Sequence, residues 1–261
     1  MDNRPIGIMD SGVGGLTVAR VLHEKYPKEG MIFLGDSLRN PYGERTRDEI
    51  ARFAGEIKDF LIKKNVKMII IACNTISFNV YPSFLEGPVP VVKMSLDVTG
   101  DITLPEGTKK AGIFATPASI RTHAHKKYVE KKFPEVEWVE VPCDGVAAAI
   151  EQGKDENFIS ALVQKAAKEY HALGIDAGYW ACTHYPLAPS AFARVFPKVP
   201  FIDPALPTVE AGMAILQRED RLAEGKGRDE FYFTDGLAHA EPLVKRLFGP
   251  AAVEKTNLVG E

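Results

Sequence analysis

Two cysteines end short apolar runs in nearly the same local sequence. Cys73 follows the run 68–72 and precedes Asn and Thr, and Cys182 follows the run 177–181 and precedes Thr and His. Such a run predicts a buried parallel strand, and the residues after its carboxyl end enter the crevice where open α/β sheets bind ligands. A thiol with a pKa of about 8.5 can exchange a proton near neutral pH. We therefore expect one site with a thiol on each side. The alternative is that both cysteines are small apolar side chains in the core, which would be the favoured interpretation of either cysteine alone.

The turn after the first predicted strand, at 5–9, also offers polar groups. It reads DSGVGG from position 10 to 15 and precedes a helix from 16 to about 26. A dinucleotide-binding turn would need glycine at position 17, which is Thr17, and Asp10 would repel a pyrophosphate. We expect instead that free backbone N–H groups of the turn hold a small carboxylate, with Asp10 and Ser11 at the same sheet end as Cys73. The alternative for Asp10 is a simple helix N-cap.

The composition is that of a globular protein with a core of its own. The chain has 261 residues, of which 45% are hydrophobic and 26% are charged, and its formal net charge is −3. This charge gives no basic face for a phosphate backbone, which excludes nucleic acid as a primary partner. Without a long apolar window or an apolar leader, we expect a soluble, cytoplasmic protein with no membrane contact. Three cysteines without a C-x-x-C pair exclude a disulfide framework and a zinc knuckle, and they indicate a reducing compartment.

The order of the predicted elements indicates an α/β fold. Strands at 31–34, 68–72 and 89–94 alternate with helices, the clearest at 46–64, which gives a mainly parallel, doubly wound sheet. The polar stretch 97–109 predicts a crossing into a second, similar unit. We expect the chain to cross back near 201–204, so that the segments in 208–248 complete the outer layer of the first unit. We therefore predict a discontinuous first domain, 1–96 plus 207–261, and a second domain, 97–206.

Other candidate residues have a structural alternative. The loop 35–45 carries an expected exposed aromatic, Tyr42, and is interpreted as a wall or lid of the site. His123 and His125 could touch a metal, but positions i and i+2 of a helix do not share a face, so a solvated basic surface is favoured. Cys143 lacks the repeated cysteine pattern and is interpreted as structural, and Glu151 alone would be a solvated carboxylate. The helix 157–173 is expected to bury a row of side chains: Phe158, Leu162, Ala166 and Tyr170.

Four motifs in this order resemble the glutamate racemases of the cofactor-independent aspartate/glutamate racemase family. They span positions 10–16, 41–43, 72–75 and 182–186, and the resemblance runs from residue 6 to about residue 210. The resemblance implies two α/β domains facing each other across a cleft, with a mainly parallel sheet in each. It implies interconversion of L- and D-glutamate for bacterial peptidoglycan, an amino acid as the partner, and no cofactor or metal.

The resemblance also assigns residues. Cys73 and Cys182 match the two catalytic cysteines, and Asp10, Glu151 and His184 match the polar groups that assist them. The positions that match substrate contacts are Asp10, Ser11, Tyr42, Gly43, Asn74, Thr75, Thr116, Ser119, Thr183 and His184. Ser119 stands where the family pattern leads us to expect threonine. Two stretches, 76–78 and 93–97, also differ from the usual pattern, and either could reshape the pocket for another side chain.

Two thiols suit the inversion of a stereocentre. A proton must leave one face of Cα and another must arrive on the opposite face, so two fixed groups serve better than one mobile base. Our hypothesis is that Asp10 orients the Cys73 thiol and that protonated His184 supports a Cys182 thiolate. The open alternatives are a racemase of the same family acting on aspartate or another amino acid, a thiol redox protein that uses both cysteines, and a small-ligand binding module. A homodimer is also an open alternative.

Overall fold

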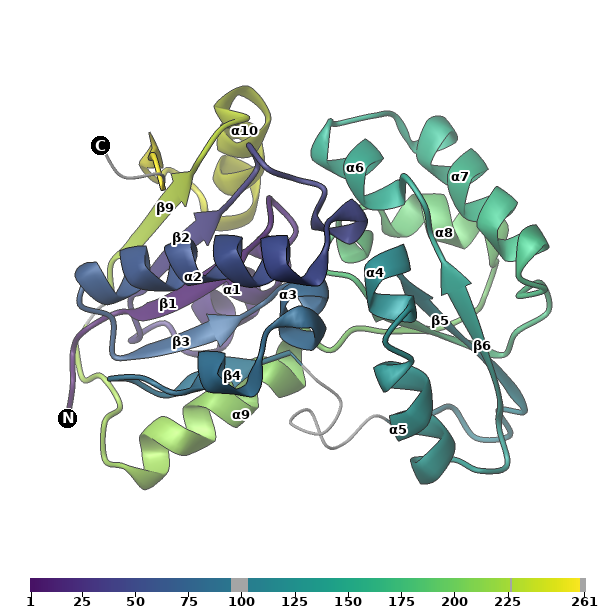
Figure 1. Cartoon of the computed structure of the whole chain (residues 1–261), viewed down its shortest axis with the longest axis horizontal. Coiled ribbons are helices and arrows are strands. Elements are labelled where there is room, and N and C mark those ends of the chain that lie inside the picture. Colours follow the sequence, from purple (N-terminus) through teal and green to yellow (C-terminus); the bar gives the residue numbers. More distant parts are fainter. Residues whose placement is uncertain (95–102, 226, 259–261) are drawn as a thin grey trace.

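Two parallel β-sheets form the centre of the molecule, and helices cover both faces of each (Figure 1). The structure is a computed structural model that describes residues 1–94, 103–225 and 227–258. The first sheet has six strands in the order β10-β9-β2-β1-β3-β4, and the second has four in the order β6-β5-β7-β8. Every strand pair within them is parallel. The expected α/β class with mainly parallel sheets is therefore confirmed.

The first sheet separates two apolar cores because alternate residues of its strands point to opposite faces. Its strands are β1 Ile6–Asp10, β2 Met31–Gly35, β3 Met68–Ile71, β4 Val91–Lys93, β9 Asp229–Phe233 and β10 Val253–Lys255. Ile8 and Ile70 pack on one face, whereas Met9 and Ile71 pack on the other. The first face is covered by α1 Leu16–Lys25, α9 Ala205–Arg218 and α10 Leu237–Phe248, and the second by α2 Arg47–Lys63 and α3 Asn74–Asn79.

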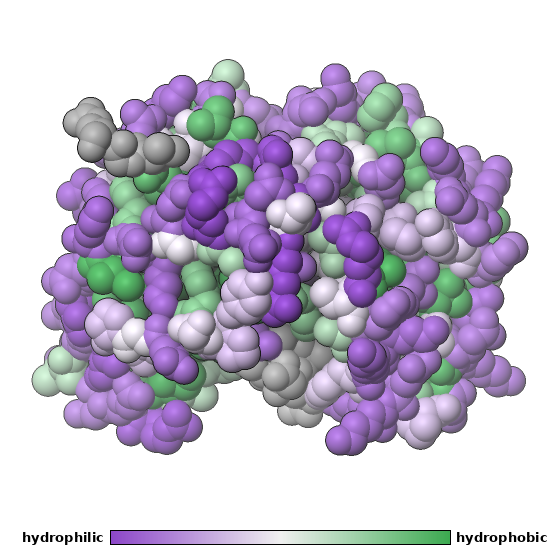
Figure 2. All heavy atoms as spheres, viewed as in Figure 1, coloured by the Kyte–Doolittle hydropathy of each residue, from purple (hydrophilic) through white to green (hydrophobic). Residues whose placement is uncertain are grey.

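The second sheet is smaller and follows the same plan. Its strands are β5 Lys110–Ala115, β6 Glu137–Pro142, β7 Ala177–Ala181 and β8 Phe201–Ile202. Its helices are α4 Pro117–Ile120, α5 Ala124–Lys132, α6 Val146–Glu151, α7 Glu156–Glu169 and α8 Pro189–Val195. Short 3₁₀ turns at η1 Tyr42–Glu44, η2 Pro82–Leu85 and η3 Tyr185–Leu187 complete the elements. Figure 2 shows that hydrophilic residues dominate the visible face, with hydrophobic residues dispersed among them.

The end of the chain contributes more to the first sheet than expected. β9 pairs with β2, Phe231 lying opposite Phe33, so this strand belongs to the sheet itself and only α9 and α10 form an outer layer. β10, which the sequence did not suggest, pairs with β9 at the sheet edge. The predicted domain boundaries stay a prediction, and residues 97–102 of the expected crossing lie outside the described residues.

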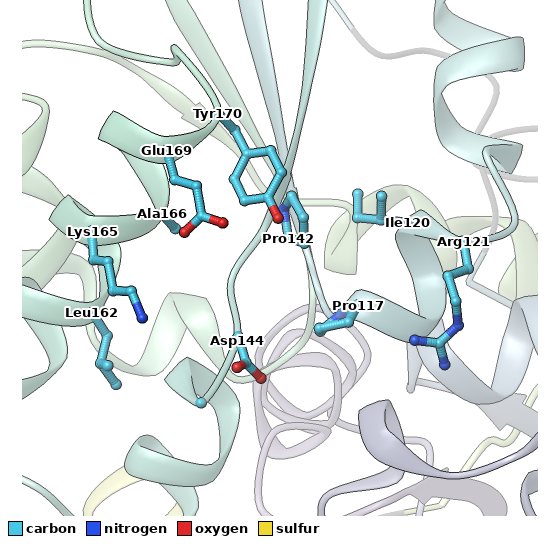
Figure 3. Close-up of a pocket in the computed structure, with 11 residues that line it drawn as sticks. Pro117, Ile120, Arg121, Pro142, Asp144, Leu162, Lys165, Ala166, Glu169 and Tyr170 are labelled. Atoms are coloured by element: carbon cyan, nitrogen blue, oxygen red, sulfur yellow. The ribbon is translucent and has the colours of Figure 1, made fainter.

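The buried face of α7 differs from the predicted one. Phe158 and Tyr170 are 49% and 37% exposed, so the predicted row is wrong at both ends. The side chains that α7 buries are Ile159, Val163, Ala166 and Ala167. The aromatic residues suggested a row displaced by one position, whereas the smaller aliphatic side chains fit against the sheet. Leu162 and Tyr170 instead line a surface hollow of about 490 Å³ between α4, the end of β6 and α7 (Figure 3). Among the described residues, those that line this hollow include no predicted site residue.

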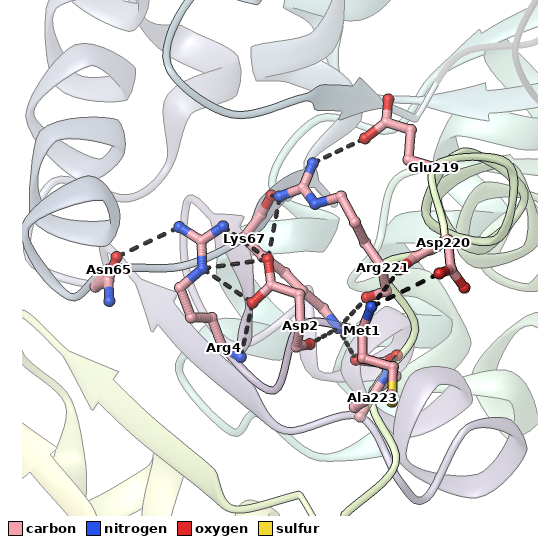
Figure 4. A network of polar contacts seen from close by, with 10 residues as sticks. Met1, Asp2, Arg4, Asn65, Lys67, Glu219, Asp220, Arg221 and Ala223 are labelled. Carbon is pink, nitrogen blue, oxygen red and sulfur yellow. Dashed lines mark hydrogen bonds and ion pairs between the residues drawn. The ribbon is translucent and has the colours of Figure 1, made fainter.

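A buried lysine ties the beginning of the chain to the segment after α9 (Figure 4). The Lys67 ammonium lies 2.6 Å from a carboxylate oxygen of Glu29 and donates to the backbone oxygens of Asp2 and Arg221 at 2.7 and 2.9 Å. Arg4 hydrogen-bonds the Asp2 carboxylate and holds its pKa well below the usual range. The network fixes the start of β3, the strand that leads to Cys73.

Candidate active site

Strand register brings the two cysteine motifs to corresponding sheet edges. In the first sheet Met9 lies opposite Ile71, so Asp10 and Cys73 follow neighbouring strands. In the second sheet Ala115 lies opposite Ala181, and Cys182 therefore emerges beside the residue that follows β5. We call the part built on the six-stranded sheet the first half of the molecule and the part built on the four-stranded sheet the second half. The helices α3 and α4, which begin at these edges, contact each other between the two halves (Figure 1).

Both thiols line one cavity. Its volume is about 20 Å³, which is space for a single water molecule. The predicted residues that line it are Ser11, Tyr42, Gly43, Cys73, Asn74, Thr75, Thr116, Cys182, Thr183 and His184. Asn40 and Pro41, from the predicted wall loop, and Ala147 also line it, although none of them was predicted to contact a substrate. Of the remaining predicted residues, Asp10, Ser119 and Glu151 lie behind this lining, where they bond to residues that form it.

Burial and a nearby negative charge favour the protonated form of Cys73 and outweigh its hydrogen bonds. The thiol is buried and donates to the Ser11 hydroxyl, with 3.6 Å between Sγ and Oγ. Burial raises the pKa of Cys73 to about 12, and the negative charge of Asp10 acts in the same direction. At neutral pH this side chain is therefore a thiol, suited to donate a proton.

Cys182 has a histidine and a carboxylate beside it instead. Its Sγ lies 3.9 Å from Nδ1 of His184, whose Nε2 lies 2.6 Å from Oε2 of Glu151. Burial would lower the pKa of His184, but hydrogen bonds with Cys182 and Glu151 hold it well above the usual value. Burial would raise the pKa of Glu151, and the hydrogen bond from His184 leads the contacts that lower it. His184 thus places a positive charge beside Cys182, whereas Asp10 places a negative charge near Cys73.

Asp10 connects the two halves of the site. One carboxylate oxygen accepts from the Gly12 amide at 3.0 Å, and the other accepts from the Thr183 hydroxyl at 3.0 Å. Burial raises the pKa of Asp10 to about 6, although the positive charge of His184 opposes this. Helix α1 begins at Leu16 with a different N-cap, so Asp10 is not a helix cap. Its effect on Cys73 is electrostatic, and its proposed role in orienting that thiol stays a prediction.

The glycine turn does not hold a carboxylate of a ligand in the way the sequence suggested. The Gly12 amide donates to Asp10, and the Val13 amide donates to Glu151 at 2.9 Å. A Cβ atom at Gly12 would lie 2.6 Å from the Glu151 carboxyl carbon, and one at Gly14 would lie 2.6 Å from a hydroxyl oxygen of the second half. The expectation of free N–H groups is therefore wrong for the amides of Gly12 and Val13. The glycines are needed because polar side chains of the second half pack directly on the turn.

Three hydroxyl groups meet where α3 and α4 approach each other. Thr75 Oγ1 lies 2.9 Å from Thr116 Oγ1 and 3.4 Å from the Ser119 hydroxyl, and the latter two are 3.1 Å apart. Thr116 is also the N-cap of α4, which explains its position at the end of β5. Each hydroxyl can turn its donor toward a carboxylate, so this cluster can bind an acidic ligand.

Tyr42 is buried rather than exposed, which corrects the sequence expectation. Only 1% of its surface is accessible, and its hydroxyl donates to the Asp36 carboxylate. Arg39 and Thr234 donate to the same carboxylate at 2.5 and 2.7 Å. The loop after β2 is thus a fixed wall of the cavity. The Asn40 amide donates to the backbone oxygen of Ser11 at 3.0 Å, and extending the motif 41–43 by one residue would have found it.

Comparison with known proteins identifies the family of the chain. The Asp/Glu/Hydantoin racemase model matches residues 6–212. The glutamate racemase of Lactobacillus helveticus is 32% identical over 256 residues, which cover 96% of each chain. The glutamate racemase of Bacillus anthracis has a TM-score of 0.86 at 27% identity, and that of Francisella tularensis, in complex with D-glutamate, has 0.84 at 31%; both cover 99% of each chain. The chain belongs to the Asp/Glu/Hydantoin racemase family. The expectation that it is a racemase, and thus an isomerase, is confirmed.

In this racemase, His125 is a site residue that the sequence interpretation missed. It is only 2% exposed, and its Nε2 lies 3.1 Å from the Asn74 side-chain oxygen. Burial lowers the pKa of His125 to about 3, so it is neutral. The predicted basic surface is therefore wrong for this residue, whereas His123 is exposed and contacts Glu140 at 2.7 Å. Helical spacing showed that the two histidines differ in direction but not which of them faces the site.

Described residues of the two stretches that differ from the family pattern contact His125 or Asn74. The Phe78 ring is tilted by 53° against the His125 ring with 4.3 Å between centroids, and neither Phe78 nor its two predecessors lines the cavity. Asn74 donates to the Met94 sulfur at 3.0 Å. Because a thioether only accepts, this contact fixes the orientation of the Asn74 amide and requires His125 to donate from Nε2. Residues 95–97 of the second stretch lie outside the described residues.

The remaining candidates of the racemase lie away from the cavity lining. All three cysteines are free thiols, and Cys143 is buried and donates to the backbone oxygen of Val141 at 3.4 Å.

Over the described ranges, no group of three or more His, Cys, Asp and Glu side chains could hold a metal ion. Each helix in the part of the chain that the structure describes is too short or too polar to span a membrane.

Proposed function

We propose that this racemase interconverts L- and D-glutamate by a two-base mechanism that uses Cys73 and Cys182 and no cofactor. The observation that carries the proposal is that the two thiols line one cavity from different sheets. Removal of the Cα proton by one thiolate and donation by the opposite thiol inverts the stereocentre. Net protonation is unchanged, and the two cysteines exchange roles for the reverse reaction.

The unequal surroundings of the thiols support a direction for each step. Cys182 beside the His184 imidazolium takes the proton as a thiolate, and Cys73, with a pKa of about 12, donates one. Because the enantiomers have equal free energies, kcat/KM must be the same in both directions. His184→Asn should therefore lower kcat more in the direction that begins with Cys182, with a parallel change in KM. Equal losses of kcat in both directions would count against this assignment.

The polar groups of the cavity suit an acidic amino acid. The hydroxyl cluster of Thr75, Thr116 and Ser119, together with the Asn74 amide, offers donors for carboxylates without an arginine. The similarity to glutamate racemases, one of them in complex with D-glutamate, supports glutamate as this amino acid. Since glutamate is far larger than one water molecule, the two halves must separate to admit it.

The biological role is part of the same proposal. Supply of D-glutamate for peptidoglycan in the cytoplasm follows from the family resemblance and accounts for a racemase with this substrate. A homodimer stays a prediction, which sedimentation of the purified protein would test.

The test is incorporation of solvent deuterium at Cα of each glutamate enantiomer. We expect incorporation and inversion with the wild type, and losses of racemisation by a factor of about 10³ in Cys73→Ser and Cys182→Ser. Cys143→Ser is the matched control and should remain active. Full racemisation by both site variants would refute the two-thiol mechanism, and oxidation that links Cys73 to Cys182 without any exchange would favour a redox protein.

Substrate identity needs a second measurement. Turnover should be compared for glutamate, aspartate and a panel of other amino acids in heavy water. A preference for aspartate would leave the proposed two-thiol mechanism in place and would replace glutamate by aspartate as the proposed substrate. Binding of an amino acid without exchange of its Cα proton would indicate a ligand-binding module.

A further inference from the structure

Ser37 contacts the carboxylate that supports the second thiol, although it belongs to the other half of the molecule. It follows β2, and its hydroxyl donates a short hydrogen bond to Oε1 of Glu151. The other oxygen of Glu151 accepts from the Val13 amide at 2.9 Å and pairs with Nε2 of His184 at 2.6 Å. Two donors from the first half thus hold a carboxylate of the second half in place.

We propose that Ser37 is a positioning residue for proton transfer at Cys182, acting through Glu151 and His184. Burial alone would favour a neutral Glu151, and donated hydrogen bonds stabilise its ionised form. An ionised Glu151 keeps His184 as the imidazolium that supports the thiolate. This inference deepens the two-thiol function and rests on it.

The position of Ser37 is itself fixed. The amide of the next residue, Leu38, donates to the Thr234 hydroxyl at 3.0 Å, and Thr234 donates to the Asp36 carboxylate at 2.7 Å. Gly236 approaches closely, since a Cβ atom there would lie 3.6 Å from the Ser37 Cβ. Because the backbone next to Ser37 is fixed in this way, little further backbone freedom is lost when its hydroxyl binds Glu151.

The hydrogen bond between Ser37 and Glu151 links closure of the two halves to proton transfer at Cys182. The donors belong to the first half and Glu151 to the second, so separation of the two halves breaks the hydrogen bonds that keep Glu151 ionised. His184 is therefore fully supported only when the halves are together and the reacting carbon is shielded from water. Among the described residues, the Cys182 thiol and Asp10 also face this pair, and the charge of Asp10 favours the imidazolium.

The experiment compares Ser37→Ala with Ser37→Thr, which keeps a hydroxyl, and with Ser83→Ala, a serine exposed on η2. We expect Ser37→Ala to lower kcat/KM for glutamate about tenfold and to move the acid limb of its pH profile upward by about one pH unit. The acid limb moves upward because Glu151 becomes protonated at a higher pH when it has lost a hydrogen-bond donor. The shift is visible in kcat/KM because the pH dependence of kcat/KM reports the groups of the free enzyme. Ser37→Thr should restore most of the rate and the profile, and Ser83→Ala should change neither.

Three outcomes separate the possible failures. If Ser37→Ala matches the wild type in rate and profile, the inference is overturned while the two-thiol function stands. A lower rate with an unshifted profile, together with a lower melting temperature, would assign Ser37 a structural role only and also overturn it. Absence of Cα exchange in the wild type would refute the proposed function itself.

Discussion

Replacement of Asp10 by asparagine should make the folded protein more stable at neutral pH. Asp10 is fully buried, and burial raises its pKa from 3.8 to about 6 in spite of the nearby His184 charge. A carboxyl group with a higher pKa in the folded state holds its proton more tightly there. The free energy of unfolding therefore falls as the pH rises from about 4 through 6. An amide of the same shape has no charge to bury and avoids this loss.

The two pKa values set the size of the effect. A tenfold change in an ionisation constant corresponds to about 1.4 kcal/mol, so the change from 3.8 to about 6 costs about 3 kcal/mol at pH 7.5. At pH 4.5 the cost is only about 1 kcal/mol, because the folded state is still protonated while the unfolded state is mostly ionised. The stability advantage of Asp10→Asn over the wild type should grow by about 2 kcal/mol between these two pH values.

Urea unfolding at pH 4.5, 6 and 7.5 measures this difference by linear extrapolation. Asp59→Asn is the matched control, since it makes the same exchange of side chain at an exposed position of α2. We also expect Asp10→Asn to racemise more slowly, because the charge that faces His184 is lost. A gap between Asp10→Asn and the wild type that does not change with pH, or that shrinks toward pH 7.5, would refute the reasoning.

Three further substitutions test other contacts. Lys67→Met leaves Glu29 buried without its cation and should lower the free energy of unfolding by about 3–5 kcal/mol; adding Glu29→Leu should recover part of the loss in urea unfolding, and a double variant as unstable as the single one would contradict this. Gly14→Ala should reduce racemisation more than tenfold with an unchanged circular dichroism spectrum, since its methyl group would approach a hydroxyl of the second half to 2.6 Å. Gly55→Ala, in open space on a helix, is its control and should stabilise the protein by about 1 kcal/mol. His125→Phe keeps the ring but loses the donor, so KM for glutamate should rise about fivefold, whereas His125→Gln should retain most of the affinity; equal KM values would exclude a hydrogen-bonding role.

Much of the site followed from local sequence because strand ends position it. The apolar runs before Cys73 and Cys182 identify buried strands, and parallel strands deliver the residues that follow them to one sheet edge. Tyr42 and Gly43 could be placed at the cavity by their motif, but the burial of Tyr42 depends on Asp36, whose role no local pattern indicates.

The parts that could not be predicted depend on contacts between distant segments. His125 belongs to a helix with many charged residues, and only its position against Asn74 and Phe78 shows that it faces the interior. The partner of the Val13 amide is Glu151, from the other half of the chain, so the turn gave no sign that its N–H group was already used. Residues on α7 illustrate a different limit, because two neighbouring rows of a helix can both be apolar and only packing selects one.

The small volume between the two thiols affects how substrate affinity should be understood. A substrate carboxylate that binds among Thr75, Thr116 and Ser119 must first break hydrogen bonds that these hydroxyls make with one another. The observed dissociation constant is then the intrinsic constant divided by the fraction of molecules whose halves are apart. A modest KM would be compatible with strong contacts in the bound state, and a substitution that weakens the hydroxyl cluster could tighten apparent binding even though it removes a donor.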